Sequence, residues 1–251
     1  MNKYNMAFVS LLGGALLITA GCASSPRYSQ IQDQDVAQEL SEPASSAKKL
    51  GTKWGEDVDS AVVTVAASRL TDKPYDTAAI YYRGERVPSN VSTLSKVSLS
   101  PVNVKVVNEN GRTMPMYRNK QGQYILPAQE GQRYQLIIAN ADKNRTYEVV
   151  TTVDGIDVLN GRVGSYQNSG YLVRPNSELT IEGFRKNSDQ VAAFRFAAPE
   201  ESYVNQNVQG DERNIGVIGV AIFEVREELP DCEANPFPAD NGYAPAPCRK
   251  R

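Results

Sequence analysis

From about Ser60 onward, hydrophobic residues occur in short runs that are mostly rich in Val, Ile, Thr or Tyr. Such runs, with Gly, Asn, Asp or Pro nearby as breakers, are typical of β-strands joined by turns. No long segment has the spacing of an amphipathic helix. The sequence therefore predicts an all-β protein, an antiparallel β-sandwich built as one large or two small sandwiches. The runs are 61–68, 77–84, 102–111, 134–141, 147–155, 170–175, 178–185, 191–197 and 214–225.

Two runs predict how their strands are buried. In ELTIEGF, Leu179, Ile181 and Gly183 fall on one side and polar residues on the other, so one face of this strand should be buried in the core and the other exposed to solvent. The run IGVIGVAIF, residues 215–223, is apolar throughout, which predicts a central strand covered on both faces. Its two glycines form only part of a dinucleotide-binding fingerprint, and close backbone packing or a bulge explains them better.

Composition divides the chain into further stretches. Residues 22–57 are rich in Ser, Gln, Asp, Glu and Ala and have few large apolar residues, which predicts a disordered tether. A β-rich region over 58–144 and a β-sandwich domain over 145–226 follow. The first of these is either a second sandwich or the other half of the same one. The chain ends in a Pro-rich tail over 227–251.

The segment 1–21 has the layout of an export signal, with Lys3 followed by uncharged, mostly apolar residues and then small ones. The apolar run is shorter than the roughly 20 residues that a spanning helix needs. The motif LITAGC, ending at Cys22, resembles the lipobox of bacterial lipoproteins, although Thr19 stands where that family prefers leucine. The alternative is an ordinary signal peptide cleaved nearby, with Cys22 incidental.

The resemblance implies that Cys22 carries a thioether-linked diacylglycerol, a further acyl chain such as palmitate, and the start of the mature chain. Two or more acyl chains give stable membrane anchoring. Ala23, and not aspartate, follows the cysteine. In the Gram-negative lipoproteins that this segment resembles, that choice favours the outer membrane, where the protein would face the periplasm or the cell surface.

Cys232 and Cys248 remain as an even pair in the Pro-rich tail. We predict a disulfide between them, since closing a loop of about 15 residues is worth about 3 kcal/mol and the periplasm permits the bond. A metal site is the weaker alternative. The chain has no histidine, and two thiolates are too few for a closed zinc site.

Charge and composition give little support to catalysis. A net charge of −2 creates no strong field that would point to nucleic acid. The lack of histidine excludes Ser-His and Cys-His nucleophiles. Two carboxylate pairs, Asp154 with Asp157 and Glu182 with Asp189, could serve a hydrolase, yet Asp before Gly is a common turn signal. We predict no catalytic residue, cofactor or metal ligand.

Binding is better supported. The polar connection over 200–214 is longer than a tight hairpin, and we predict a contact loop there with Tyr203, Asn205, Asn207 and Asp211. Aromatic side chains could also provide platforms for a glycan or a protein, although tyrosine is equally a good strand residue. These side chains are Trp54, Tyr81, Tyr82, Tyr166, Tyr171 and Tyr203.

These features predict a lipoprotein of the outer membrane that acts as a structural or interaction component of a cell-envelope assembly. Its partners would be the membrane, through the lipid anchor, and other envelope proteins, with no nucleic acid. The first alternative is a glycan-binding module, and the second is a carboxylate-dependent hydrolase.

Overall fold

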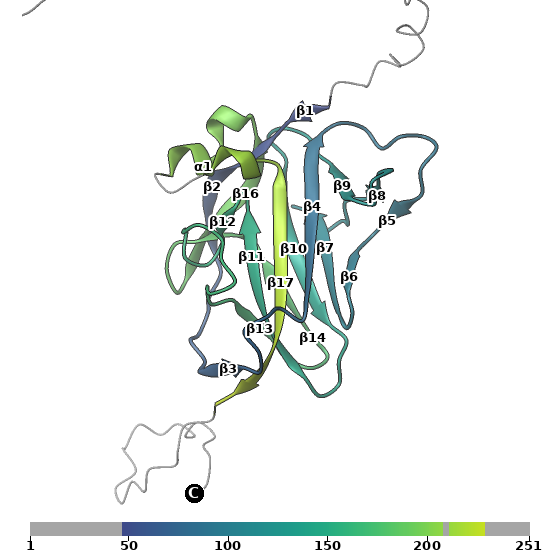
Figure 1. The fold of residues 1–251 in the computed structure, drawn as a ribbon. Coiled ribbons are helices and arrows are strands. Elements are labelled where there is room, and N and C mark those ends of the chain that lie inside the picture. The colour runs from purple at the N-terminus through teal and green to yellow at the C-terminus, as the bar shows by residue number, and fades with distance from the viewer. Residues whose placement is uncertain (1–46, 208–210, 229–251) are drawn as a thin grey trace, which may run out of the picture. The chain divides into compact units, whose positions relative to one another are not determined.

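The structure, a computed structural model, describes residues 47–207 and 211–228, which form two β-sheets packed together (Figure 1). The predicted all-β sandwich is confirmed. The predicted signal peptide, most of the predicted tether and the cysteines Cys22, Cys232 and Cys248 lie outside the described residues, and so does the predicted disulfide.

The larger sheet, here sheet A, has ten strands in the described part of the chain. Its main order is β12-β11-β17-β4-β9-β8-β5, and β17 is central. All its pairs are antiparallel except β4 with β9. The strands are β1 (Lys48–Lys49), β3 (Ala67–Arg69), β4 (Asp76–Gly84), β5 (Thr93–Leu94), β8 (Met116–Arg118), β9 (Tyr124–Pro127), β11 (Thr146–Val153), β12 (Ile156–Asp157), β13 (Tyr171–Val173) and β17 (Val217–Glu227).

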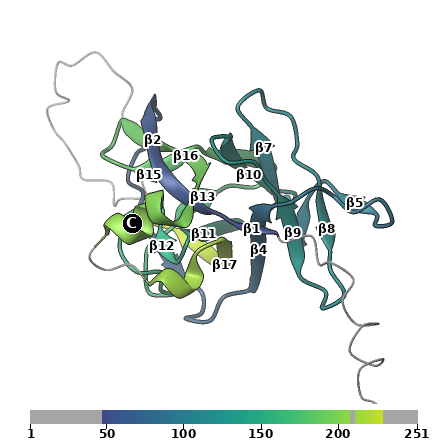
Figure 2. The same ribbon diagram turned by 90° about the horizontal axis from the view of Figure 1, so that it is seen from above.

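The smaller sheet, sheet B, has seven strands in the same described ranges, and its main order is β15-β16-β10-β7-β6. The strand β14 pairs with β10, and β2 pairs with β16. Figure 2 shows the strands of the two sheets as separate layers. The strands are β2 (Gly51–Asp59), β6 (Val97–Leu99), β7 (Val102–Asn108), β10 (Arg133–Asn140), β14 (Ser177–Ile181), β15 (Gly183–Arg185) and β16 (Gln190–Ala197).

The core lies between the sheets because successive strand residues point to opposite faces. Along β10 every second residue is buried, and the same alternation places Leu179 and Ile181 of β14 toward the interior. Aromatic rings fill the centre: Tyr134 stacks on Phe196, with ring centroids 4.2 Å apart. The predicted inward and outward faces of the ELTIEGF strand agree with this burial.

The two β-rich stretches of the sequence are halves of one sandwich. The strand β4, from the first stretch, pairs with β17, from the second, over Val217–Ile222. In sheet B, β10 of the first stretch pairs with β14 of the second. Each sheet therefore contains strands of both stretches.

The predicted tether is wrong in its last residues. The strand β2 begins at Gly51 and pairs with β16, and Leu50, Gly51 and Thr52 are buried. Its later residues are mostly charged and face solvent, as in many edge strands, so the segment contains too few apolar residues to be recognised as a strand.

The strand predicted over 61–68 is also largely wrong. Only Ala67–Arg69 pair, as β3, and residues 60–66 have no strand structure. These residues connect β2 of sheet B to β3 of sheet A. The segment keeps a few backbone hydrogen bonds, from Ser60 and Val62 to the turn before β16, but it leaves the regular ladder of both sheets, so its β-type composition does not produce a strand here.

A bulge interrupts β16 between Ala192 and Phe194. Two glycines lie beside it: Gly183 on β15 and Gly55 on β2. A Cβ atom at Gly55 would come within 2.5 Å of the Ala193 carbonyl oxygen, and one at Gly183 would overlap the Ala192 carbonyl oxygen. The bulge therefore fits because both flanking positions lack a side chain.

The connection between β16 and β17 contains the short helices of the described chain. They are the 3-10 turn η1 (Pro199–Glu201), the helix α1 (Tyr203–Gln206) and the 3-10 turn η2 (Glu212–Asn214). The end of η2 leads through Gly216, with φ of +93°, into β17.

Candidate binding groove

The outward faces of β11, β17 and β4 form the floor of a groove on sheet A. The register pairs Thr152 with Gly219 and Gly219 with Ala79. Bulky residues of β17, among them Ile218 and Ile222, point the other way into the core. The groove-facing positions of these three strands are small or β-branched. They are Thr77, Ala79, Val150, Thr152, Gly219 and Ala221.

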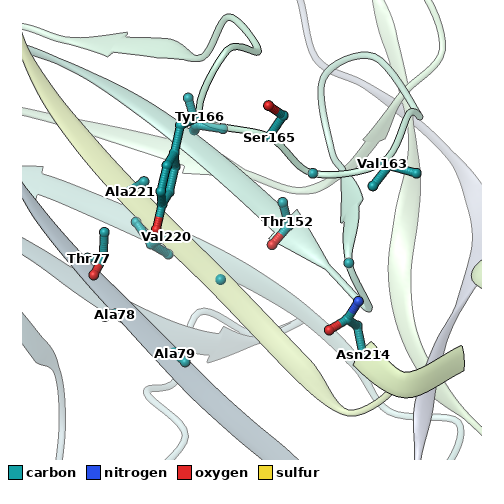
Figure 3. Close-up of a pocket in the computed structure, with 14 residues that line it drawn as sticks. Thr77, Ala78, Ala79, Thr152, Val163, Ser165, Tyr166, Asn214, Val220 and Ala221 are labelled. Atoms are coloured by element: carbon teal, nitrogen blue, oxygen red, sulfur yellow. The ribbon is translucent and has the colours of Figure 1, made fainter. Parts of the chain in front are cut away.

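The connection between β12 and β13 forms a wall beside this floor through Val163, Gly164, Ser165 and Tyr166. Figure 3 shows Tyr166 near Ala221 and places Asn214 at the other end of the groove. The volume of the open groove is about 650 Å³. This size falls within the range of small-ligand sites, about 300–1,000 Å³.

Two glycines bring the floor and the wall close together at Thr152. A Cβ atom at Gly219 would lie 2.5 Å from the Thr152 hydroxyl oxygen, and one at Gly164 would lie 2.5 Å from the Thr152 methyl carbon. Larger residues at these positions would therefore displace Thr152. At Gly219, therefore, the lack of a side chain allows close packing against Thr152.

The buried side chain of Asp157 holds the start of the wall. Its Oδ1 accepts hydrogen bonds from the backbone N–H of Leu159, at 2.8 Å, and of Asn160, at 3.1 Å. Its Oδ2 accepts from the Asn168 amide at 3.0 Å, and that amide also donates to the Val163 carbonyl at 3.2 Å. The Asp157 carboxylate thus bonds residues on both sides of the wall, Leu159 and Asn160 before it and Asn168 after it.

Arg69 of β3 holds the rest of the wall. Its guanidinium donates to the carbonyl oxygens of Tyr166 and Asn168 and pairs with Glu148, with an Nε–Oε2 distance of 2.5 Å. The second oxygen of Glu148 accepts from the Gly170 N–H at 2.7 Å. Because several hydrogen bonds define these residues, the wall is preorganised before any ligand arrives.

Tyr166 is an aromatic side chain at the edge of the groove, and its ring packs against a neighbouring ring. It is 53% exposed, and its ring meets Phe223 edge-on, with centroids 6.3 Å apart. The Arg69 guanidinium also lies over the Phe223 ring, 3.7 Å from its centroid. Phe223 therefore supports both the ring that borders the groove and the cation that fixes the wall.

The groove is uncharged, and its lining sets hydroxyl and amide groups among small apolar residues. Among the described residues that line it, none is Asp, Glu, Lys or Arg. Hydroxyl groups come from Thr77, Thr152, Ser165 and Tyr166, and Asn214 adds an amide. Such a surface suits an uncharged ligand that exchanges hydrogen bonds, because charged ligands need compensating charges when they are desolvated.

A second polar cluster lies inside the sandwich around Asp154. Its Oδ2 accepts from the Thr52 N–H at 2.7 Å, and its Oδ1 accepts from the Gly216 N–H at 2.8 Å and the Tyr82 hydroxyl at 2.5 Å. The Thr52 hydroxyl joins Tyr82 and Tyr134, each at 2.8 Å. Burial raises the pKa of both tyrosines well above their ordinary range, so both remain protonated.

Burial also raises the pKa of Asp154 from 3.8 to about 6, and outweighs the opposing effect of its hydrogen bonds. The folded protein then holds this proton to a higher pH than the unfolded chain. Its contribution to stability is complete below about pH 4 and is lost as the pH rises through about 6. We expect the free energy of unfolding, measured with urea, to be about 1 kcal/mol larger at pH 5 than at pH 7.

The variant Asp154→Asn should lack this increase. Asp157, whose pKa burial also raises, adds a change of the same sign and remains in the variant. Glu56 and Glu227 have lowered pKa values, so they lose their protons below the interval from pH 5 to pH 7. Their effect on the free energy of unfolding has the opposite sign, because such groups stabilise the fold as the pH rises. An equal rise in the wild type and in Asp154→Asn would show that another group is responsible.

The carboxylates that could have served a hydrolase take part in these structural contacts. Asp154 and Asp157 are 1% exposed, and each accepts several hydrogen bonds. Glu182 accepts from the Gln135 amide at 3.1 Å, and Asp189 accepts from the Ser188 hydroxyl at 2.9 Å. In the two described ranges no cluster of three or more His, Cys, Asp or Glu residues could hold a metal ion.

The four residues named in the predicted contact loop are not among the residues that line the groove, although Asn214 at the end of that loop is. Tyr203, in α1, packs on Trp54 with ring centroids 4.9 Å apart. The Asn205 amide donates to the Pro199 carbonyl at 2.7 Å, and the Asn207 amide donates to the Gly161 carbonyl at 2.9 Å. The connection is therefore partly tied to the sandwich, and its role in contacts stays a prediction.

Asp211 lies at the start of η2 and accepts a hydrogen bond from the Arg213 N–H at 3.0 Å. The same carboxylate forms an ion pair with the Arg213 guanidinium, 2.7 Å away. Residues 208–210, between Asn207 and Asp211, lie outside the described residues.

The six aromatic residues considered as platforms fall into different environments. Tyr82 and Tyr171 are buried and Tyr81 is half-buried, whereas Trp54 and Tyr203 cluster with Phe184. Tyr166 is the member of the six that borders the groove described above. We did not predict a groove from the sequence at the small residues of the floor. A signal was present, because Gly219 and Ala221 alternate with large apolar residues along the chain.

Comparisons with protein-family models, with curated proteins and with solved structures found no match for this chain. Within residues 47–207 and 211–228, no helix has the length and apolar character that a membrane crossing requires.

Proposed function

We propose that this protein is a lipid-anchored interaction component of a bacterial cell-envelope assembly, attached to the outer membrane through Cys22 and facing the periplasm or the cell surface. The groove on the outward face of sheet A is the contact surface. The LITAGC motif supports the anchor, because its spacing and its Ala-Gly-Cys ending resemble a lipobox. A tether after Cys22 would let the sandwich reach a partner away from the membrane.

The observation that carries the proposed binding role is the neutral groove beside a preorganised wall. Its hydroxyl groups have no acidic or basic side chain beside them among the described lining residues. A hydroxyl nucleophile needs a neighbouring base for activation, so this surface is suited to binding and not to covalent catalysis. The hydrogen bonds of Arg69 and Asp157 keep the wall in place without a ligand.

Site-specific photo-cross-linking from the groove tests this role. With a benzophenone-bearing phenylalanine at Val163, which is 51% exposed at the groove, irradiation of cells should give a major product of higher mass. The matched control is Val63, an apolar residue that is 85% exposed and lies outside the groove lining. The benzophenone inserts into C–H bonds, so it captures proteins and glycans alike, and mass spectrometry identifies the product.

Cys22→Ser, combined with the label at Val163, tests the anchor in the same experiment. We expect the variant to accumulate as an unlipidated precursor, to lose lipid labelling and to lose the cross-linked product. Equal cross-linking from Val63 and Val163, or none from either, would contradict the proposed contact surface. Normal lipid labelling and processing of Cys22→Ser would contradict the anchor.

A further inference from the structure

We propose that the groove on the outward face of sheet A binds a neutral glycan, with Tyr166 as the platform for one sugar ring. This inference rests on the proposed function, because it names the chemistry of the partner that the groove holds. Three properties of the groove support a neutral glycan: its uncharged lining, its unpaired hydroxyl groups and its exposed aromatic ring.

The uncharged lining of the groove disfavours ionic ligands. None of the described residues that line it carries a charge, and Arg69, the β3 cation that holds the wall, is already engaged by Glu148 and by two carbonyl oxygens. An acidic polysaccharide or a nucleic acid needs cations along its path. A neutral sugar enters without leaving an unpaired charge.

The hydrogen-bonding groups select for a polyhydroxyl ligand over an apolar segment. The hydroxyl groups of Thr77, Thr152 and Tyr166 make no hydrogen bond to any other residue that the structure describes, and they open into the groove (Figure 3). An apolar peptide side chain would cover these groups and leave them unsatisfied. A sugar carries hydroxyl groups that both donate and accept, and therefore satisfies them.

Tyr166 provides an apolar face for the ring of the sugar. It is 53% exposed, its carbonyl is fixed by Arg69, and its ring rests edge-on against Phe223. A supported ring loses little conformational freedom on binding. The small floor residues Gly219 and Ala221 leave the space beside the ring open.

Binding of defined oligosaccharides to the full chain, purified in detergent, tests the inference. The neutral probes are chitohexaose and maltohexaose, and hexagalacturonate is the acidic control. Isothermal titration should give saturable binding of at least one neutral probe, and weaker binding of hexagalacturonate. Tyr166→Ala should weaken the neutral binding about fivefold, whereas Tyr166→Phe, which keeps the ring, should lose less.

Tyr75→Ala is the matched control for Tyr166→Ala. Tyr75 is 49% exposed and lies outside the groove lining, so its removal should leave the affinity unchanged. Thermal unfolding of each variant checks that the fold is intact. Failure of both neutral probes to bind, equal binding of hexagalacturonate, or an equal loss in Tyr75→Ala and Tyr166→Ala would overturn the inference.

The cross-linking experiment separates this inference from the proposed function. If Val163 captures an envelope protein and neither neutral probe binds, the partner is a polypeptide, so the glycan inference fails and the proposed contact surface stands. Capture of a second copy of this chain overturns the glycan inference in the same way. If Val163 captures nothing in cells, the proposed contact surface fails, whatever the probes do.

Discussion

Replacing Asp154 with alanine should lower the free energy of unfolding by about 4 kcal/mol. The change leaves two buried backbone N–H groups, of Thr52 and Gly216, without their acceptor, and each such group costs about 1–3 kcal/mol. It also forces alanine into a left-handed conformation, since Asp154 has φ of +53°, at a cost of about 1 kcal/mol. Urea unfolding at pH 7 measures the loss.

Asp154→Asn should cost less than Asp154→Ala, because asparagine tolerates the left-handed conformation and keeps one acceptor oxygen. Asp72→Ala is the control. Asp72 is exposed in the connection between β3 and β4, and its removal should change stability by about 0.5 kcal/mol at most. A similar small loss for Asp154→Ala would mean that water replaces the carboxylate and that the cluster does not secure the sandwich.

Replacing Gly183 with alanine should destabilise the fold by about 3 kcal/mol, although it adds a single methyl group. The added Cβ would overlap the carbonyl oxygen of Ala192 in the bulge of β16. The obstacle is backbone, and the bulge is bordered on its other side by Gly55, whose own Cβ would lie 2.5 Å from the Ala193 carbonyl oxygen. The bulge therefore cannot move away without meeting β2.

Gly84→Ala provides the comparison for Gly183→Ala. Gly84 is the last residue of β4, and the atom nearest to its added Cβ would be the Lys48 Cβ, at 3.1 Å, in the short strand β1. We expect its stability to change by about 0.5 kcal/mol or less, since alanine lowers the conformational entropy of the unfolded chain and this offsets mild crowding. Thermal and urea unfolding of both variants should separate them. Equal stabilities would show that the β16 bulge relaxes freely.

Much of the fold can be predicted from local composition. The runs that became β4, β7, β10, β11 and β17 are rich in Val, Ile, Thr or Tyr and stand between breakers, so their positions follow from the sequence. The alternation in ELTIEGF correctly separates the faces of β14. The central position of β17 follows from its continuous apolar character, and the structure confirms it.

The remaining features depend on tertiary position. The strand β2 exists because β16 pairs with it, and its charged residues conceal it in the sequence. The groove floor combines side chains from three strands distant in sequence, so no local motif marks it. The roles of Asp154 and Asp157 also depend on tertiary position and do not follow from the sequence. Their spacing is equally compatible with catalysis and with turn formation, and the structure places both in hydrogen-bonded, buried positions.

The central position of β17 also constrains when the sandwich can be completed. In sheet A, β11 and β4 are joined through β17, which is the last described strand in chain order. A chain that emerges from its N-terminus therefore has the two flanking strands available long before the strand that unites them. Assembly of sheet A has to wait until residue 227 is available, and pairings so distant in sequence form slowly. A chain shortened before Val217 would lose the continuity of the sheet, not only one strand.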